Sequence, residues 1–153
     1  MNAVVLADEL MKRGYKLITD GTDNHIVLMS CIDKGLTGSK VETALDEVHI
    51  TLNKNTIIGD KSAITPGGVR IGTPAVTTRG YMDADMREVG RFIDEGFKIS
   101  LDIQKERGKK LVEFKKGLAA SEPIKQLRDD VHEFSCQFDI PGFSPHDIDE
   151  DVI

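Results

Sequence analysis

Apolar residues recur every three or four positions in several stretches of the chain, and this spacing predicts helices that bury one side. The first stretch runs from Asn2 to Arg13 and stops at Gly14, a residue type that commonly ends helices. The longest covers 83–106, and its predicted apolar side consists of Met86, Val89, Phe92 or Ile93, Phe97, Leu101 and Ile103. Shorter helices are predicted over 40–48, 111–118 and 123–134.

Short apolar or alternating runs predict strands over Tyr15–Thr19, His25–Ile32 and His49–Leu52, and a further strand around Arg70. Before the helix at 40–48, Ser39 and Glu42 have the three-residue spacing of an N-cap and its capping-box partner. The predicted order is a helix, two antiparallel strands, a helix, a strand, the Arg70 strand and then helices. This order favours a small α/β fold, an α+β two-layer sandwich.

The Arg70 strand lies between a glycine pair and the breakers Gly72 and Pro74. Alternation places Val69 and Ile71 on one face and Arg70 on the other, so the guanidinium is aimed away from the apolar side. A guanidinium near a strand end suits a planar carboxylate, because its forked donors can pair with both oxygens. The alternatives are a surface residue and a structural ion pair.

Two other polar groups have competing interpretations. The amides of Asn53–Asn55 could bind the edges of a heterocycle, or could cap a turn, which is the default for this residue type. His25 could act as an acid or base, because histidine titrates near neutrality, but a histidine at a strand start is more often structural.

Composition narrows the function classes. The chain has 153 residues, which indicates one domain, and a net charge of -6 with a pI near 5.2 argues against nucleic-acid or anionic-membrane binding.

The cysteines, Cys31 and Cys136, lack metal-ligand spacing and are expected to be reduced and structural. No apolar run is long enough for a signal peptide or membrane span, so a cytoplasmic location is expected. The acidic end, 139–153, is expected to be a mobile tail.

Three segments occur in a specific order: GTDNH at 21–25, NKNTIIGD at 53–60 and GGVRIGTPAVTTRG at 67–80. In that order and spacing they resemble the C-terminal small domain of serine hydroxymethyltransferase. This family consists of pyridoxal-phosphate enzymes that interconvert serine and glycine with tetrahydrofolate. The resemblance implies that 1–138 is the small domain of a fold-type-I pyridoxal-phosphate enzyme, with a mostly antiparallel sheet and helices packed on one face.

The resemblance also implies roles for two residues. Arg70 matches the arginine that binds the carboxylate of the amino-acid substrate, and Asn55 matches an asparagine that helps bind the pteridine of tetrahydrofolate. The loop from Asn55 to Thr65 would line the same opening. No catalytic, cofactor-binding or metal-binding residue is expected in this chain.

The family's Schiff-base lysine and its surroundings have no match here, so the chain alone is expected to be inactive and not to bind pyridoxal phosphate productively. Its implied partners are the large domain of the same enzyme and the small molecules serine, glycine and tetrahydrofolate. The full enzyme would be a homodimer or homotetramer, and an organellar form is the alternative to a cytoplasmic one. The competing functions are a non-catalytic carboxylate-binding or dimerisation module of the same fold, and a different pyridoxal-phosphate enzyme.

Overall fold

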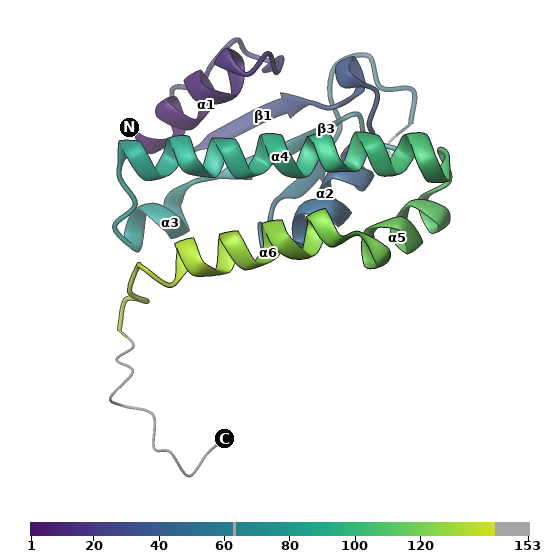
Figure 1. The fold of residues 1–153 in the computed structure, drawn as a ribbon. Helices are drawn as coiled ribbons and strands as arrows, with labels where there is room; N and C mark the ends of the chain where they lie inside the picture. Colours follow the sequence, from purple (N-terminus) through teal and green to yellow (C-terminus); the bar gives the residue numbers. More distant parts are fainter. Residues whose placement is uncertain (63, 143–153) are drawn as a thin grey trace.

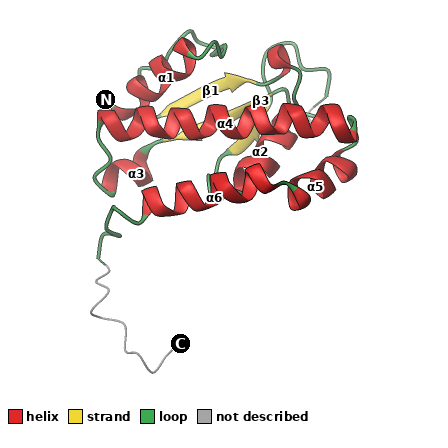
Figure 2. Ribbon diagram, in the orientation of Figure 1, coloured by secondary structure: helices red, strands yellow, loops and turns green. Residues whose placement is uncertain are grey.

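A computed structural model describes residues 1–62 and 64–142 (Figures 1 and 2). Its helices are α1 (Asn2–Lys12), α2 (Gly38–Asp46), α3 (Pro74–Thr78), α4 (Asp83–Arg107), α5 (Leu111–Ala120) and α6 (Glu122–Ser135), with a 3-10 turn at Ile32–Lys34. Its strands are β1 (Ile26–Ser30), β2 (Asn53–Asn55) and β3 (Gly68–Gly72). Most of the tail predicted over 139–153 lies outside the described residues.

The strands form one antiparallel sheet in the order β1-β3-β2, and the helices lie together on one face of it (Figure 1). The inner face of the sheet contributes Val27 and Met29 from β1 and Val69 and Ile71 from β3, all at most 5% exposed. These side chains pack against the helices in a single core. The two-layer α/β fold with an antiparallel sheet and helices on one face is therefore confirmed.

The long helix is the centre of the helical layer. α4 contacts α1, α2, α5 and α6, and its buried apolar residues are Met86, Phe92, Ile93, Phe97 and Ile103. Val89 and Leu101 are partly buried, so the side predicted from the spacing is the side that packs. In the part of the chain that the structure describes, no helix is both long and apolar enough to cross a bilayer.

Two predicted strands are wrong. Within Tyr15–Thr19 only Leu17 forms a β-bridge, to Met29, because the chain enters a turn in which the Asp20 amide donates to the Leu17 carbonyl. The segment His49–Leu52 is not a strand either, since the chain is still leaving α2 there. His49 has a left-handed φ of 63°, and the amide of Ile50 donates back to Leu45. Pairing with β3 begins only at Asn53.

The predicted capping box of the second helix is also wrong. α2 starts at Gly38 with Thr37 as N-cap, and neither Ser39 nor Thr37 makes a side-chain cap bond. The start is set by a tertiary contact, because the Gly38 amide donates to the Pro66 carbonyl at 2.8 Å. Glu42 instead accepts bonds from the backbone amide of Lys54, at 3.0 Å, and from its Nζ, at 2.6 Å, and so ties α2 to β2.

Candidate functional site

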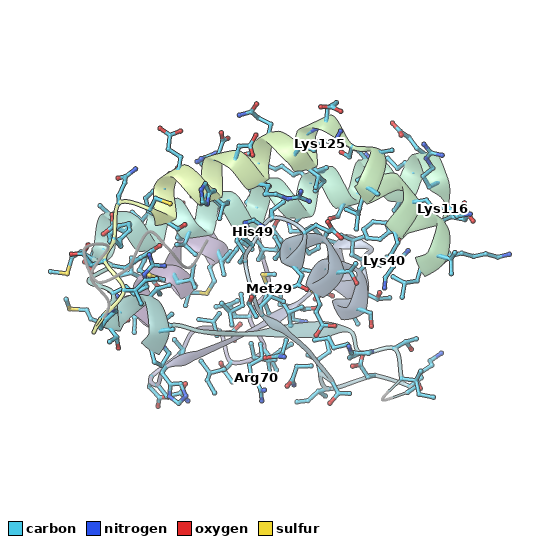
Figure 3. The ribbon with its side chains drawn as sticks, turned by 90° about the horizontal axis from the view of Figure 1, so that it is seen from below. Met29, Lys40, His49, Arg70, Lys116 and Lys125 are labelled. Carbon is cyan, nitrogen blue, oxygen red and sulfur yellow. The ribbon has the colours of Figure 1, made fainter. Side chains whose placement is uncertain are left out.

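Arg70 projects from β3 on the sheet face that carries no helix, whereas Met29 and Lys40 lie toward the helical layer (Figure 3). Its neighbours Val69 and Ile71 are buried in the core and fix the strand, so the exposed guanidinium is carried on a rigid element. Among the described residues, no carboxylate lies within ion-pair distance of Arg70 and no acceptor bonds its side chain. Its donors are therefore available to a ligand, and the structural ion pair considered above is not formed in this part of the chain.

The register places one apolar and one amide side chain beside Arg70. Leu28 of β1 lies opposite Arg70 on one side, and Asn53 of β2 lies opposite it on the other. Directly paired residues of antiparallel strands point to the same face. The guanidinium is thus flanked by an aliphatic side chain and by an amide that can bond the same ligand.

Arg70 lies in a shallow hollow of about 460 Å³. The other residues that line this hollow are His25, Ile26, Thr51, Leu52, Asn53, Gly72, Pro74 and Ala75. His25 is exposed there, and its backbone carbonyl accepts from the Thr73 amide at 3.2 Å. The hollow can hold a small anion between Arg70 and neutral polar groups. Sequence reasoning named Arg70 and, for a heterocycle, the amides of Asn53–Asn55. It did not place Asn53 beside Arg70, because only strand pairing brings the two together, and it missed Thr51.

Asn55 lies on the same strand as Asn53 but is not a lining residue of the Arg70 hollow. It is paired with Gly68, two residues along β2 and so about 7 Å from Asn53. Its side-chain nitrogen donates to the Thr56 carbonyl at 2.7 Å. This bond orients the amide at the start of the loop that follows β2.

The loop after β2 is closed at its base by Asp60. The Asp60 carboxylate accepts from the amide of Ile57 at 2.9 Å and from the amide of Gly67 at 2.8 Å. A Cβ on Gly67 would lie 2.4 Å from an Asp60 oxygen, which explains the glycine at this position. Beyond this base, Ile58 and Ile64 are 90% and 86% exposed. The loop therefore exposes two large apolar side chains to solvent.

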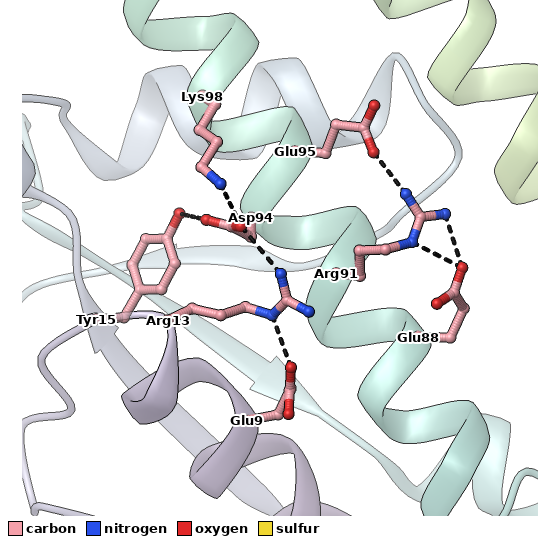
Figure 4. Close-up of polar contacts among 8 residues, drawn as sticks. All are labelled: Glu9, Arg13, Tyr15, Glu88, Arg91, Asp94, Glu95 and Lys98. Carbon is pink, nitrogen blue, oxygen red and sulfur yellow. Dashed lines mark hydrogen bonds and ion pairs between the residues drawn. The ribbon is translucent and has the colours of Figure 1, made fainter.

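The densest polar cluster is on the helical side and holds the fold together (Figure 4). The Asp94 carboxylate accepts from Tyr15 Oη at 2.9 Å, Arg13 Nη1 at 3.1 Å and Lys98 Nζ at 2.7 Å. Burial raises the pKa of Asp94, but these bonds outweigh burial and hold that pKa below its ordinary value. Burial and the bond to Asp94 raise the pKa of Tyr15. These groups stay in one protonation state near neutral pH and do not form an acid–base pair.

Lys40 is the buried lysine of the described ranges, and it lies on α2 in the helical layer (Figure 3). Its Nζ donates to Gln104 of α4 and lies 5.4 Å from the centre of the Phe114 ring. Burial, with a smaller contribution from Lys109, lowers the pKa of Lys40. Since the sheet separates Lys40 from the Arg70 hollow, this lysine cannot serve a ligand bound there.

The cysteines differ in environment. Cys31 is buried, and burial raises the pKa of its thiol to about 12. Cys136 is exposed at the end of α6, with its sulfur 3.8 Å from His132 Nε2. Both thiols are free. Cys136 was expected to have a structural role, but its side chain is exposed and therefore does not contribute to the core.

Comparison with known proteins identifies the family. The family model for serine hydroxymethyltransferase matches residues 1–93. The chain is 49% identical over 142 residues to serine hydroxymethyltransferase 4 of Arabidopsis thaliana, covering 93% of this chain and 30% of that protein. It is 44% identical over 141 residues to the cytosolic serine hydroxymethyltransferase of Candida albicans, covering 90% and 30%. It is 40% identical over 148 residues to the mitochondrial enzyme of Candida glabrata, covering 92% and 30%.

The chain thus spans about 30% of the length of these relatives, while the matches cover nearly all of its own length. The relatives carry both cytosolic and mitochondrial names, so the match leaves the compartment open. A family model that covers 1–93 includes the open sheet face, Arg70 and both asparagines. On these grounds the chain belongs to the serine hydroxymethyltransferase family.

Proposed function

We propose that this chain is the C-terminal small domain of a serine hydroxymethyltransferase, with residues 1–138 forming the domain. The enzyme would interconvert serine plus tetrahydrofolate and glycine plus 5,10-methylenetetrahydrofolate. The observation that carries the proposal is Arg70, a cation exposed on a rigid strand and unpaired among the described residues, on the face that no helix covers.

Arg70 is proposed to bind the carboxylate of serine or glycine. Two parallel N–H···O bonds would set both the position and the plane of the carboxylate. Asn53 would add a neutral donor beside the guanidinium, and Leu28 would exclude water from its other side. Charge-assisted bonds of this kind contribute about 1.5–3 kcal/mol each, enough to orient a small amino acid.

Asn55 is proposed to contribute to the folate site. Its amide is held by Thr56 at the start of the loop from Asn55 to Thr65, beside the open sheet face. The pteridine ring has donor and acceptor edges that an amide can match. The exposed apolar side chains Ile58 and Ile64 would cover the ring or the large domain in the assembled enzyme.

The residues of this chain do not fit pyridoxal phosphate by themselves. That cofactor supplies an electron sink when it is bound, and the enzyme holds it through a lysine. No lysine lines the Arg70 hollow, and Lys40 is on the other side of the sheet. The cofactor site would therefore belong to the large domain, which is the proposed partner. The chain alone would be inactive, and the complete enzyme would be a homodimer or homotetramer, in the cytoplasm or an organelle.

A reconstitution assay tests the proposal. This chain is mixed with a separately produced large domain of the same enzyme, pyridoxal phosphate, serine and tetrahydrofolate, and methylenetetrahydrofolate formation is followed. We expect activity only when both pieces are present. Arg70→Ala should lower kcat/KM for serine by at least about a hundredfold, since two charge-assisted bonds are lost.

Arg87→Ala is the matched control. Arg87 is another exposed arginine, but it lies on α4 and bonds only the Asp83 carbonyl at 3.3 Å, so its removal should leave kcat/KM unchanged. A folded, associating pair without activity would instead support a non-catalytic carboxylate-binding or dimerisation module. An Arg70→Ala pair with full activity would overturn the role proposed for Arg70.

A further inference from the structure

The strand that carries Asn53 is short and lies at the edge of the sheet. β2 contains only Asn53–Asn55, and in the described sheet it has β3 as its single neighbour. Irregular chain precedes it, and the loop that begins at Thr56 follows it. Peptide groups on the outer edge of such a strand have no further strand to pair with. The pairing with β3 alone therefore gives β2 few hydrogen bonds.

Glu42 supplies bonds on this outer edge. It belongs to α2, which contacts β2. Its Oε1 accepts from the Lys54 backbone amide at 3.0 Å, and its Oε2 accepts from Lys54 Nζ at 2.6 Å. Burial raises the pKa of Glu42, but the bonds from Lys54 and the charge of Lys54 hold that pKa below its ordinary value. The carboxylate is therefore ionised at neutral pH and can accept both bonds.

The bond from the Lys54 amide to Glu42 fixes the peptide group that joins Asn53 to Lys54. That group is planar and includes the Cα atoms of both residues, so holding its N–H also places the Cα of Asn53. Asn53 lies opposite Arg70. Within residues 1–62 and 64–142, the side-chain amide of Asn53 makes no hydrogen bond. Its position beside the guanidinium therefore depends on its backbone.

We propose that Glu42 is a positioning residue for the carboxylate site on the open sheet face, and that it acts through the backbone of Asn53. Glu42 is not among the described residues that line the Arg70 hollow, so it does not touch a ligand there. It holds β2 from α2 in the helical layer, whereas Arg70 projects from the opposite face of the sheet (Figure 3). This role rests on the proposed function, in which Arg70 and Asn53 bind the carboxylate of serine or glycine.

A double-mutant cycle in the reconstituted enzyme tests whether Glu42 acts through Asn53. Glu42→Ala should raise KM for serine about three- to tenfold and leave kcat nearly unchanged, as one misplaced neutral hydrogen bond would do. The double variant with Glu42→Ala and Asn53→Ala should have the same KM as Asn53→Ala alone, because the second change removes the group that the first one misplaces. Effects that multiply in the double variant would overturn the proposal.

Glu42→Gln separates the backbone bond from the ion pair. A glutamine oxygen can still accept from the Lys54 amide, and the lost ion pair is partly exposed and contributes little. KM for serine should therefore stay within about twofold of the native value. A Glu42→Gln enzyme as impaired as Glu42→Ala would contradict the role of the backbone bond.

Glu47→Ala is the matched control. Glu47 is the C-cap residue of α2, and its carboxylate bonds Arg128 at 3.0 Å rather than β2. Its removal should leave KM for serine unchanged. If the native pair is active and Glu42→Ala behaves like Glu47→Ala, the role of Glu42 is wrong while the proposed function stands. An inactive native pair would instead contradict the proposed function, and the role of Glu42 with it.

Amide hydrogen exchange in the native 153-residue chain tests the bond even if Glu42→Ala does not fold. The Lys54 amide donates away from β3, so without Glu42 it would exchange like an exposed amide. We expect it to exchange at least about tenfold more slowly than an unprotected amide, since an opening step must come first. Exchange at the unprotected rate, measured by NMR, would overturn the proposal.

Discussion

Asn53 and Arg70 lie directly opposite each other on β2 and β3, on the sheet face that the helices leave open. Asn55 is paired instead with Gly68, one alternation step farther along the same strand. The register thus gives the two asparagines different neighbours, although both belong to one short polar segment. Their contributions in the proposed two-substrate enzyme should therefore separate by mutation.

In the reconstituted enzyme, Asn53→Ala should raise KM for serine about three- to tenfold, because one neutral hydrogen bond beside Arg70 is lost. The same change should leave KM for tetrahydrofolate nearly unchanged. Asn55→Ala should have the opposite pattern, with the larger effect on tetrahydrofolate. Steady-state kinetics with each substrate varied in turn measures both. If both variants affect serine alone, the folate role proposed for Asn55 is wrong.

Asp94→Ala should destabilise the isolated chain by about 3 kcal/mol, because Arg13 and Tyr15 would lose their common buried acceptor. Urea unfolding followed by circular dichroism measures this change. Asp102→Ala is the matched control on the same helix. Asp102 pairs with Lys105 in solvent, where such pairs contribute about 0–1 kcal/mol. Similar losses for both variants would contradict the structural role given to Asp94.

The Asp94 carboxylate should also make the free energy of unfolding depend on pH under acidic conditions. The pKa of Asp94 is lower in the folded chain than its ordinary value, so the folded state binds this proton less readily than the unfolded state. Its contribution is fully present above the unfolded pKa of about 3.9, and is lost as pH falls through the lower folded pKa. The stability difference between the native chain and Asp94→Asn should therefore shrink below about pH 4. Urea midpoints from neutral pH to pH 3 test this, and a constant difference would exclude Asp94 as the cause.

Gly38→Ala should destabilise the chain by about 1–3 kcal/mol, because a Cβ at this position would lie 2.1 Å from the Gly68 carbonyl oxygen. That oxygen belongs to the backbone and cannot move without displacing β3. Gly72→Ala is the control, since its Cβ would meet only Pro74 Cδ at 3.8 Å. Thermal unfolding of the two variants measures the difference. Equal stability would show that α2 can shift away from β3 at little cost.

Local pattern predicted the face on which Arg70 lies and every helix of the described residues except the short α3, Pro74–Thr78. The spacing of apolar residues predicted the buried side of α4, because a helix repeats every 3.6 residues whatever it packs against. Alternation between Val69 and Ile71 placed Arg70 on the outer face for the same reason. The family, too, could be identified from short segments in order, and the match over 1–93 confirms it. The roles of Arg70 and Asn55 remain predictions.

Tertiary structure decided what depends on residues far apart in the chain. The start of α2 is set by Pro66, not by Ser39, and Glu42 bonds Lys54 rather than its own helix. Only the pairing of β2 with β3 places Asn53 beside Arg70. The sequence by itself therefore determined the described helices other than α3, the outward face of Arg70 and the family, since these depend on local period and order. The strand register, the start of α2 and the burial of Asp94 depend on contacts between residues that are far apart in the chain. The local sequence pattern does not contain that information.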